Sequence, residues 1–155
     1  MSIAHAEPVT FELDAARQFD FWLGDWDCSW SDDSGLHLGS NSVYLDLGGT
    51  VVVENFDGRP SLDFQGLSFS VYDRKAGCWK QTWVDSGGSY LEFAGSFAAG
   101  VMELRRAGEH DDDGAVFRRR WENIERDSFD WSWQRSDDGG ETWLSLWELE
   151  YTRVL

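Results

Sequence analysis

The chain has 155 residues, of which 41% are hydrophobic and 27% charged, a composition typical of one soluble globular domain. Its formal net charge of −16 disfavours binding to nucleic acid or to an anionic membrane surface, because both are negatively charged. No apolar run approaches the roughly 20 residues that a membrane-spanning helix needs, so we expect no membrane insertion.

The segment from Met1 to Pro8 lacks the basic and apolar regions of a secretory signal, which predicts a cytoplasmic protein. Cys28 and Cys78 are too few for a disulfide framework and have no metal-binding spacing. We therefore expect both cysteines to be buried in the core or in a strand wall.

Residues 1–155 are expected to form a single domain that begins with a loose arm over residues 1–9. Asp14 is placed to cap a short helix that runs to about Leu23. Gly24 follows this segment and is suited to end the helix in a left-handed conformation. The chain then alternates, with Trp26, Cys28 and Trp30 on one side and Asp25, Asp27 and Ser29 on the other. Such a period of two predicts a strand with one buried face and one wet face.

Short glycine-rich and aspartate-rich turns divide the rest of the chain into runs of strand length. We predict about ten strands, at 25–32, 36–47, 50–57, 64–73, 78–85, 89–98, 101–107, 115–125, 128–135 and 143–153. Short connections favour antiparallel neighbours, and closure removes the two exposed edges of an open sheet. The expected fold is therefore an all-β, single antiparallel up-and-down β-barrel with a short N-terminal helix. A two-sheet sandwich is the structural alternative.

Several predicted strands place polar side chains on the same face as aromatic ones. The shared faces are Trp79, Gln81, Trp83 and Asp85; Phe117, Arg119, Trp121 and Asn123; Phe129, Trp131, Trp133 and Arg135; and Trp143, Trp147, Leu149, Tyr151 and Arg153. Each buried polar group left unpaired costs about 1–3 kcal/mol, so this mixture favours a lined cavity over a solid core. The alternative is that these groups lie at the barrel mouth or satisfy one another.

Glu54 poses a question of orientation. It shares a face with Val52 and Phe56, so either Glu54 points inward or the face of Val51 and Val53 does. An inward carboxylate needs a partner to remain charged, and Arg119 or Arg135 would be suitable.

A glycine, a tryptophan and an arginine together resemble the signature of the calycin superfamily, the lipocalin and fatty-acid-binding barrels. Gly24 and Trp26 match its G-x-W motif, and Arg153 lies near the end of the last strand. The resemblance implies a cation–π contact of Arg153 with Trp26 that ties the first strand to the last.

Nearly the whole chain resembles a bacterial family of uncharacterised lipocalin-like domains. The matching stretches are residues 19–26, Glu54, Gly66-Leu67-Ser68 with Tyr72-Asp73, residues 79–85 and residues 136–143. What this resemblance implies is a fold, because the family has no settled activity.

Two further motifs receive structural interpretations. Residues 136–143 match the Asp-box S-x-D-x-G-x-T-W, in which Ser136 and Asp138 bond the backbone of a hairpin turn. The acidic run from Glu109 to Asp113 lacks the ordered spacing of a calcium loop and is interpreted as a solvated turn. The histidines are too scattered for zinc, so we expect neither a metal nor a cofactor.

The leading hypothesis is that the barrel binds a small, partly apolar ligand. The candidate ligand-binding residues are Glu54, Ser68, Trp79, Gln81, Trp83, Arg119, Trp121, Trp133 and Arg135. One alternative is a small barrel enzyme, an isomerase, cyclase or hydrolase that uses Glu54 or Asp85 as an acid or base. Another is a homodimeric scaffold, for which outward apolar residues such as Leu144 and Leu146 would supply the contact.

Overall fold

The computed structural model describes residues 14–108 and 113–155. The predicted short helix is present as two turns of 3-10 helix, η1 (Ala15–Arg17) and η2 (Asp20–Trp22). Asp14 accepts a hydrogen bond from the Ala16 amide and so caps η1 as predicted. None of the helices in the described ranges has the length and apolar character needed to cross a bilayer. The proposed arm over residues 1–9 and most of the acidic turn, 109–112, lie outside the described residues.

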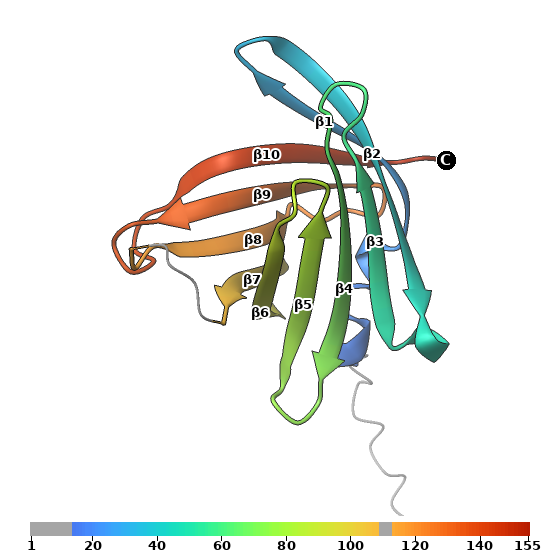
Figure 1. The fold of residues 1–155 in the computed structure, drawn as a ribbon. Helices are drawn as coiled ribbons and strands as arrows, with labels where there is room; N and C mark the ends of the chain where they lie inside the picture. Colours follow the sequence, from blue (N-terminus) through green and yellow to red (C-terminus); the bar gives the residue numbers. More distant parts are fainter. Residues whose placement is uncertain (1–13, 109–112) are drawn as a thin grey trace, which may run out of the picture.

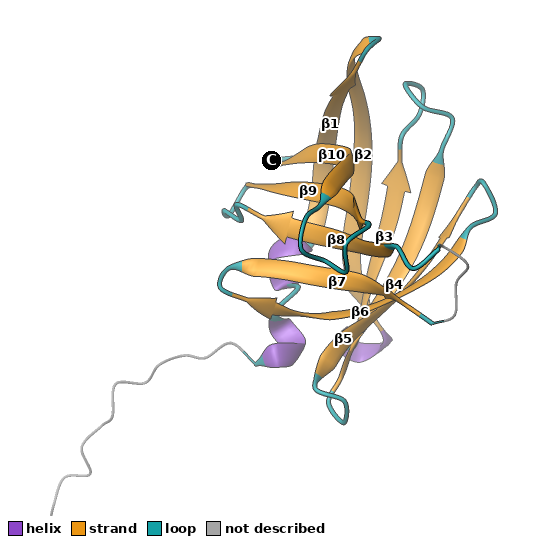
Figure 2. Cartoon of the chain, turned by 90° about the vertical axis from the view of Figure 1, so that its left-hand side faces the viewer, coloured by secondary structure: helices purple, strands orange, loops and turns teal. Residues whose placement is uncertain are grey.

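The strands form one closed antiparallel barrel in which each strand pairs with its neighbours in sequence and β1 pairs with β10 (Figures 1 and 2). The strands are β1 (Gly24–Asp32), β2 (Gly35–Asp46), β3 (Val51–Asp57), β4 (Gln65–Asp73), β5 (Cys78–Asp85), β6 (Tyr90–Ala98), β7 (Val101–Ala107), β8 (Val116–Glu122), β9 (Ser128–Ser136) and β10 (Leu144–Arg153). A third short turn, η3 (Leu47–Gly49), links β2 to β3. The up-and-down barrel is thus confirmed, and the two-sheet sandwich is wrong.

The largest difference in strand boundaries is at β8. The pattern predicts a strand to residue 125, but β8 ends at Glu122. Asn123 has a φ of 52°, which lies in the left-handed region and cannot continue an extended strand. Asparagine tolerates this conformation better than most residues, so the turn begins there.

The 3-10 turns close one end of the barrel with aromatic side chains. Phe19 and Trp22 are fully buried. The Phe19 ring lies 4.8 Å from that of Trp79 and 5.1 Å from that of Trp121, both in edge-to-face geometry. Trp22 also packs edge-to-face on Trp121. Aromatic pairs of this kind contribute beyond the area that they bury, so this plug is a substantial part of the core.

Arg153 joins the last strand to the first and to the plug. Its guanidinium lies 4.3 Å from the centre of the Trp26 ring, as the motif predicts. It also donates hydrogen bonds to the carbonyls of Leu23, at 2.6 Å, and Phe21, at 3.3 Å. Gly24 has a φ of 128°, and a Cβ there would overlap the guanidinium, so this position needs glycine.

The Asp-box is the hairpin between β9 and β10. Asp138 accepts hydrogen bonds from the amides of Glu141 and Thr142, and the Gly140 amide donates to the Ser136 hydroxyl. On the outside of the barrel, the Arg118 guanidinium lies over the Trp143 ring, with its Cζ 3.7 Å from the ring centre. The predicted structural role of this motif is therefore confirmed.

Candidate functional site

A cavity of about 290 Å³ lies inside the barrel, towards the end opposite the aromatic plug. It is lined by Glu54, Phe56, Phe64, Trp83, Asp85, Ser89, Leu91, Arg119, Trp131, Trp133, Trp147, Leu149 and Tyr151. This volume is at the lower end of small-molecule sites, which span about 300–1,000 Å³. The lining combines several tryptophans with an acid and a base, so it offers both apolar contact and polar orientation.

Glu54 points into the barrel and belongs to a hydrogen-bonded cluster. Its carboxylate accepts bonds from Asn41 Nδ2 and Ser68 Oγ, each at 2.7 Å, and its residue is 6% exposed. Asn41 Nδ2 also donates to the Tyr151 hydroxyl at 2.9 Å. Burial raises the pKa of Glu54, against the opposing effects of Arg119 and of these hydrogen bonds. The carboxyl of Glu54 is therefore held between burial, which favours its neutral form, and Arg119 with the two hydrogen bonds, which favour its charged form.

Arg119 is the buried cation of the cavity. Its Nη1 donates to Gln81 Oε1 at 2.7 Å, and Gln81 Nε2 donates to Ser70 Oγ at 2.9 Å. The guanidinium lies 4.5 Å from the Trp83 ring centre and 4.3 Å from that of Phe93. Burial lowers the pKa of Arg119 to about 10, although the charge of Glu54 opposes this. The side chain therefore stays protonated at neutral pH.

Of the two arginines predicted as partners of Glu54, Arg119 acts on it electrostatically but without a direct ion pair, and Arg135 does not reach it. Among the described residues, Glu54 makes its hydrogen bonds to Asn41 and Ser68, and no ion pair joins it to Arg119 or Arg135. The attraction between Glu54 and Arg119 acts across a longer distance. Arg119 Nε has no hydrogen-bond partner in the described part of the chain, although it is buried. An unsatisfied buried donor of this kind costs free energy unless a ligand or water occupies the site.

The other predicted site residues fall into groups. The cavity is lined by Glu54, Trp83, Arg119 and Trp133. Ser68 is hydrogen-bonded to Glu54, and Gln81 to Arg119. Trp79 and Trp121 are not brought to the cavity, because they pack against the plug at the closed end. Arg135 is not brought there either: its side chain is 37% exposed and pairs with Asp137.

The structure shows which face of β3 points into the barrel. Glu54 faces inward, yet Val51 and Val53, on the outer face, are also nearly buried. On the outer surface Val53 is flanked by Tyr44 of β2 and Phe69 of β4, its cross-strand partners. Large neighbours on both sides cover Val53, so burial alone does not identify the inner face of β3.

Sequence reasoning did not assign Asn41, which bonds Glu54, or Ser70, which bonds Gln81 beside Arg119, to the site. Asn41 lies in a strand whose two faces are both partly polar, so alternation there does not identify an inner side. Ser70 is small and belongs to a strand with several serines. Their only signal would have been the register, which places Asn41 opposite Phe56, on the inward face that Phe56 shares with Glu54, and Ser70 opposite Gln81.

Asp85 stands at the edge of the cavity and is held by the turn that follows β5. It accepts hydrogen bonds from Trp83 Nε1, at 2.9 Å, and from the amides of Gly87 and Ser89. Burial of the carboxyl acts against its ionisation, but these hydrogen bonds outweigh it and lower the pKa. Asp85 is therefore ionised and anchored, which suits a structural role better than proton transfer.

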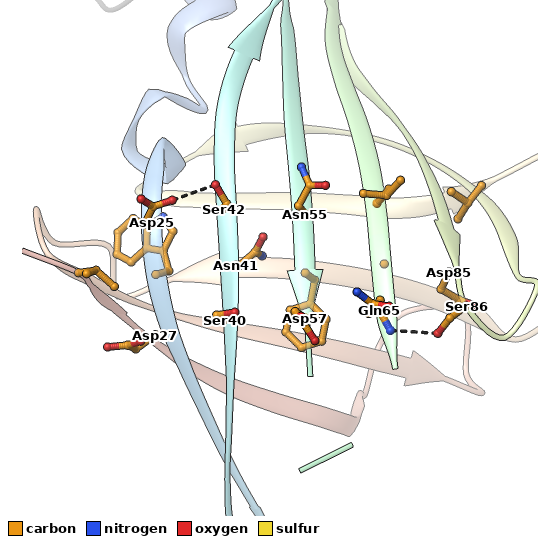
Figure 3. Close-up of a pocket in the computed structure, with 16 residues that line it drawn as sticks. Asp25, Asp27, Ser40, Asn41, Ser42, Asn55, Asp57, Gln65, Asp85 and Ser86 are labelled. Carbon is orange, nitrogen blue, oxygen red and sulfur yellow. Dashed lines mark hydrogen bonds between the residues drawn. The ribbon is translucent and has the colours of Figure 1, made fainter. Parts of the chain in front are cut away.

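A second hollow, of about 730 Å³, crosses the outer faces of β1 to β5 (Figure 3). Its polar groups satisfy one another or remain in water. Ser42 donates to Asp25 at 2.9 Å, and Arg59 donates to Asp57 through two nitrogens. The hollow thus presents solvated surface, and the interior cavity is the stronger candidate site.

Neither models of known protein families nor curated protein sequences match this chain.

The raised pKa of Glu54 has a measurable effect on stability. The folded state holds this proton more tightly than the unfolded chain, so Glu54 makes stability fall as pH rises above about 4.5, up to its folded-state pKa. Glu54→Gln removes this dependence. We expect the free energy of unfolding of the variant, minus that of the wild type, to increase over this window in urea titrations between pH 4 and pH 8. A difference that is constant with pH would contradict the assignment.

Proposed function

We propose that the chain binds a small, flat, partly apolar ligand inside the barrel, with an anionic or hydrogen-bond-accepting group against Arg119. The single observation that carries this proposal is a buried arginine that faces the cavity, has an unpaired Nε and makes no direct ion pair in the described part of the chain. A guanidinium presents its donors as a rigid fork that matches a carboxylate. The missing partner is therefore best supplied by the ligand.

The aromatic residues around the cavity favour a flat ligand. Trp131 and Phe56 each meet Trp147 edge-on, with interplanar angles of 89°. Phe64 stacks on Trp83 near the same opening. Rings that hold one another in fixed orientations offer flat faces and edges, against which a planar ligand can pack. A bicyclic aromatic acid has the shape and the charge that this cavity requires.

Glu54 need not compete with an anionic ligand for Arg119. An anionic group beside Arg119 would oppose the ionisation of Glu54 and favour its neutral form. Neutral Glu54 can still accept a hydrogen bond from Asn41 or Ser68 while it donates its own proton. The cavity thus tolerates one negative charge from the ligand without leaving an unpaired carboxylate.

Binding can be tested with a matched pair of probes, 2-naphthoate and 2-naphthamide, which share a shape but differ in charge. We expect 2-naphthoate to bind one to one in calorimetry, to quench tryptophan fluorescence, and to bind at least tenfold more tightly than the amide. Decanoate serves as a flexible acid control and should bind more weakly than 2-naphthoate. If none of the three gives a heat or a fluorescence change, the proposal is overturned.

The enzymatic alternative now depends on Glu54, because Asp85 is ionised and anchored by its turn. A carboxyl group with a raised pKa is suited to general acid or base chemistry. If the barrel is an enzyme, turnover of a bound ligand should disappear in Glu54→Gln while binding persists.

The resemblance to lipocalin-like domains agrees with this proposal. The stacking of Arg153 on Trp26 is the contact that the resemblance implies. It closes the end of the barrel away from the cavity and so leaves the other end for a ligand.

A further inference from the structure

The seam between the first and last strands is only partly paired. β1 pairs with β10 over four residues, Trp26–Ser29 with Glu150–Arg153. Beyond this point the hairpin of β1 and β2 extends away from β10, as Figure 1 shows. In residues 14–108 and 113–155, the ladder partners of Leu144–Leu149 are in β9 alone. This half of β10 is therefore a free strand edge in an otherwise closed barrel.

A groove of about 780 Å³ lies along this edge. Trp30 of β1 and Trp147 of β10 meet edge-to-face, 5.5 Å apart, where the two strands separate. Leu36 and Leu146 stand on either side and are 69% and 47% exposed. A free edge with exposed leucines is a template for pairing with another chain, because its backbone groups have no partner in the sheet.

The outer surface beside the edge carries a row of carboxylates in register. Glu122 of β8 is opposite Asp130 of β9, and Asp130 is opposite Glu150 of β10. Like charges directly across a ladder destabilise a sheet. Among the described ion pairs, only Glu122 of this row has a cation nearby, with Arg120 at 3.8 Å. Glu148, two residues before Glu150, lines the same groove.

We propose that the edge Leu144–Leu149 binds an extended basic peptide that pairs with β10 as an additional strand. Backbone hydrogen bonds to β10 would supply affinity, as in other cases of strand addition. Alternate side chains of the peptide would face outward, beside Glu148 and next to the level of Glu150, Asp130 and Glu122, so outward lysine or arginine side chains suit this surface. The inference is independent of the ligand proposed for the cavity.

A second copy of the chain fits this edge less well. Each copy carries a formal net charge of −16. Pairing of two β10 edges would bring together two chains with the same large negative charge. Charge complementarity therefore favours a cationic partner.

Two peptides test the charge requirement. Fluorescein-labelled, end-blocked (Lys-Val)4 should bind in fluorescence anisotropy, and the matched (Glu-Val)4 should not. Glu148→Lys and Glu150→Lys should each weaken binding of (Lys-Val)4 at least tenfold. The control is Glu92→Lys, the same charge change on the outer face of β6, which should alter affinity less than threefold.

Backbone methylation of the peptide tests strand pairing itself. Successive amides of a strand point to opposite sides, so methylating every second amide blocks only one edge of the peptide. Two peptides are compared, one methylated at the odd-numbered amides and the other at the even-numbered amides. We expect one of them to bind at least tenfold more weakly than the unmodified peptide and the other to differ from it by less than threefold. Amide exchange at Leu144–Leu149 should slow when unmodified (Lys-Val)4 binds.

Three outcomes would overturn the proposal. One is the absence of (Lys-Val)4 binding. Another is the same affinity for both methylated peptides; unchanged binding of both would indicate adsorption by charge alone. The third is a homodimer in light scattering whose Leu144–Leu149 amides are protected without peptide, since a second copy would then occupy the edge.

Discussion

Arg119→Met is expected to weaken 2-naphthoate binding by at least about thirtyfold while the barrel stays folded. Removing one partner of a buried, hydrogen-bonded charge pair costs about 2–5 kcal/mol, and each 1.4 kcal/mol is a factor of ten in affinity. Methionine keeps much of the volume and contacts the same rings, Trp83 and Phe93. Loss of Arg119 leaves Glu54 without its nearby cation, but burial already favours the neutral form of Glu54, so this carboxyl can take up a proton and folding should persist.

Arg118→Met is the matched control for this variant. Arg118 is the preceding residue of β8 and points outward, where it bonds Glu103 and Gln134. Its loss should leave the affinity for 2-naphthoate within twofold of the wild type. Arg119→Lys should be intermediate, since it keeps the charge and loses the planar fork. Equal affinities for Arg119→Met and the wild type would show that the ligand group does not lie against Arg119.

Trp26→Ala should lower the free energy of unfolding by about 3–5 kcal/mol, the range for truncating a buried tryptophan. The Trp26 residue is 1% exposed and its Nε1 donates to the Trp22 carbonyl at 2.8 Å. Its ring meets Phe129 edge-on and lies under Arg153. The variant therefore loses packing, a hydrogen bond and the cation–π contact together. Urea titration at constant pH measures the change.

Trp26→Phe separates these contributions, because it keeps an aromatic ring and removes the hydrogen bond; it should cost less than the alanine variant. Trp26 is not part of the cavity lining, so folded Trp26→Ala should bind 2-naphthoate within threefold of the wild type. Loss of binding with unchanged stability would place the ligand at this end of the barrel.

Turn chemistry and alternation were enough to predict the strands, because each reversal has a local cause in glycine or aspartate. The fold and its closure followed from their number. Where local pattern was insufficient, the deciding factor was long-range geometry. Alternation assigns Trp79 and Trp83 to the same face of β5 but does not say that one packs on the plug and the other lines the cavity. Depth in a barrel depends on strand tilt and stagger, which no single strand encodes.

The polar network shows the same limit. Glu54 was expected to need a charged partner; Arg119 does attract it electrostatically, but its hydrogen bonds come from Asn41 and Ser68, neutral groups on the two adjacent strands. Which polar side chains meet across strands depends on register, and register is set by the turns and by the whole barrel. This is why Asn41 was not anticipated.

The bond from Arg153 to the Leu23 carbonyl has a kinetic consequence. It connects positions 130 residues apart, and β1 and β10 pair in the same region. Contacts so distant in sequence require a large loop to close before they return any stabilisation, which makes folding slow. The β1–β10 pairing is also short, so it is the natural place for the barrel to open first. We therefore expect the amide protons of β1 and β10 to exchange faster than those of β3 to β5. We expect the packing of the aromatic plug to set the rate at which the β1–β10 pairing opens.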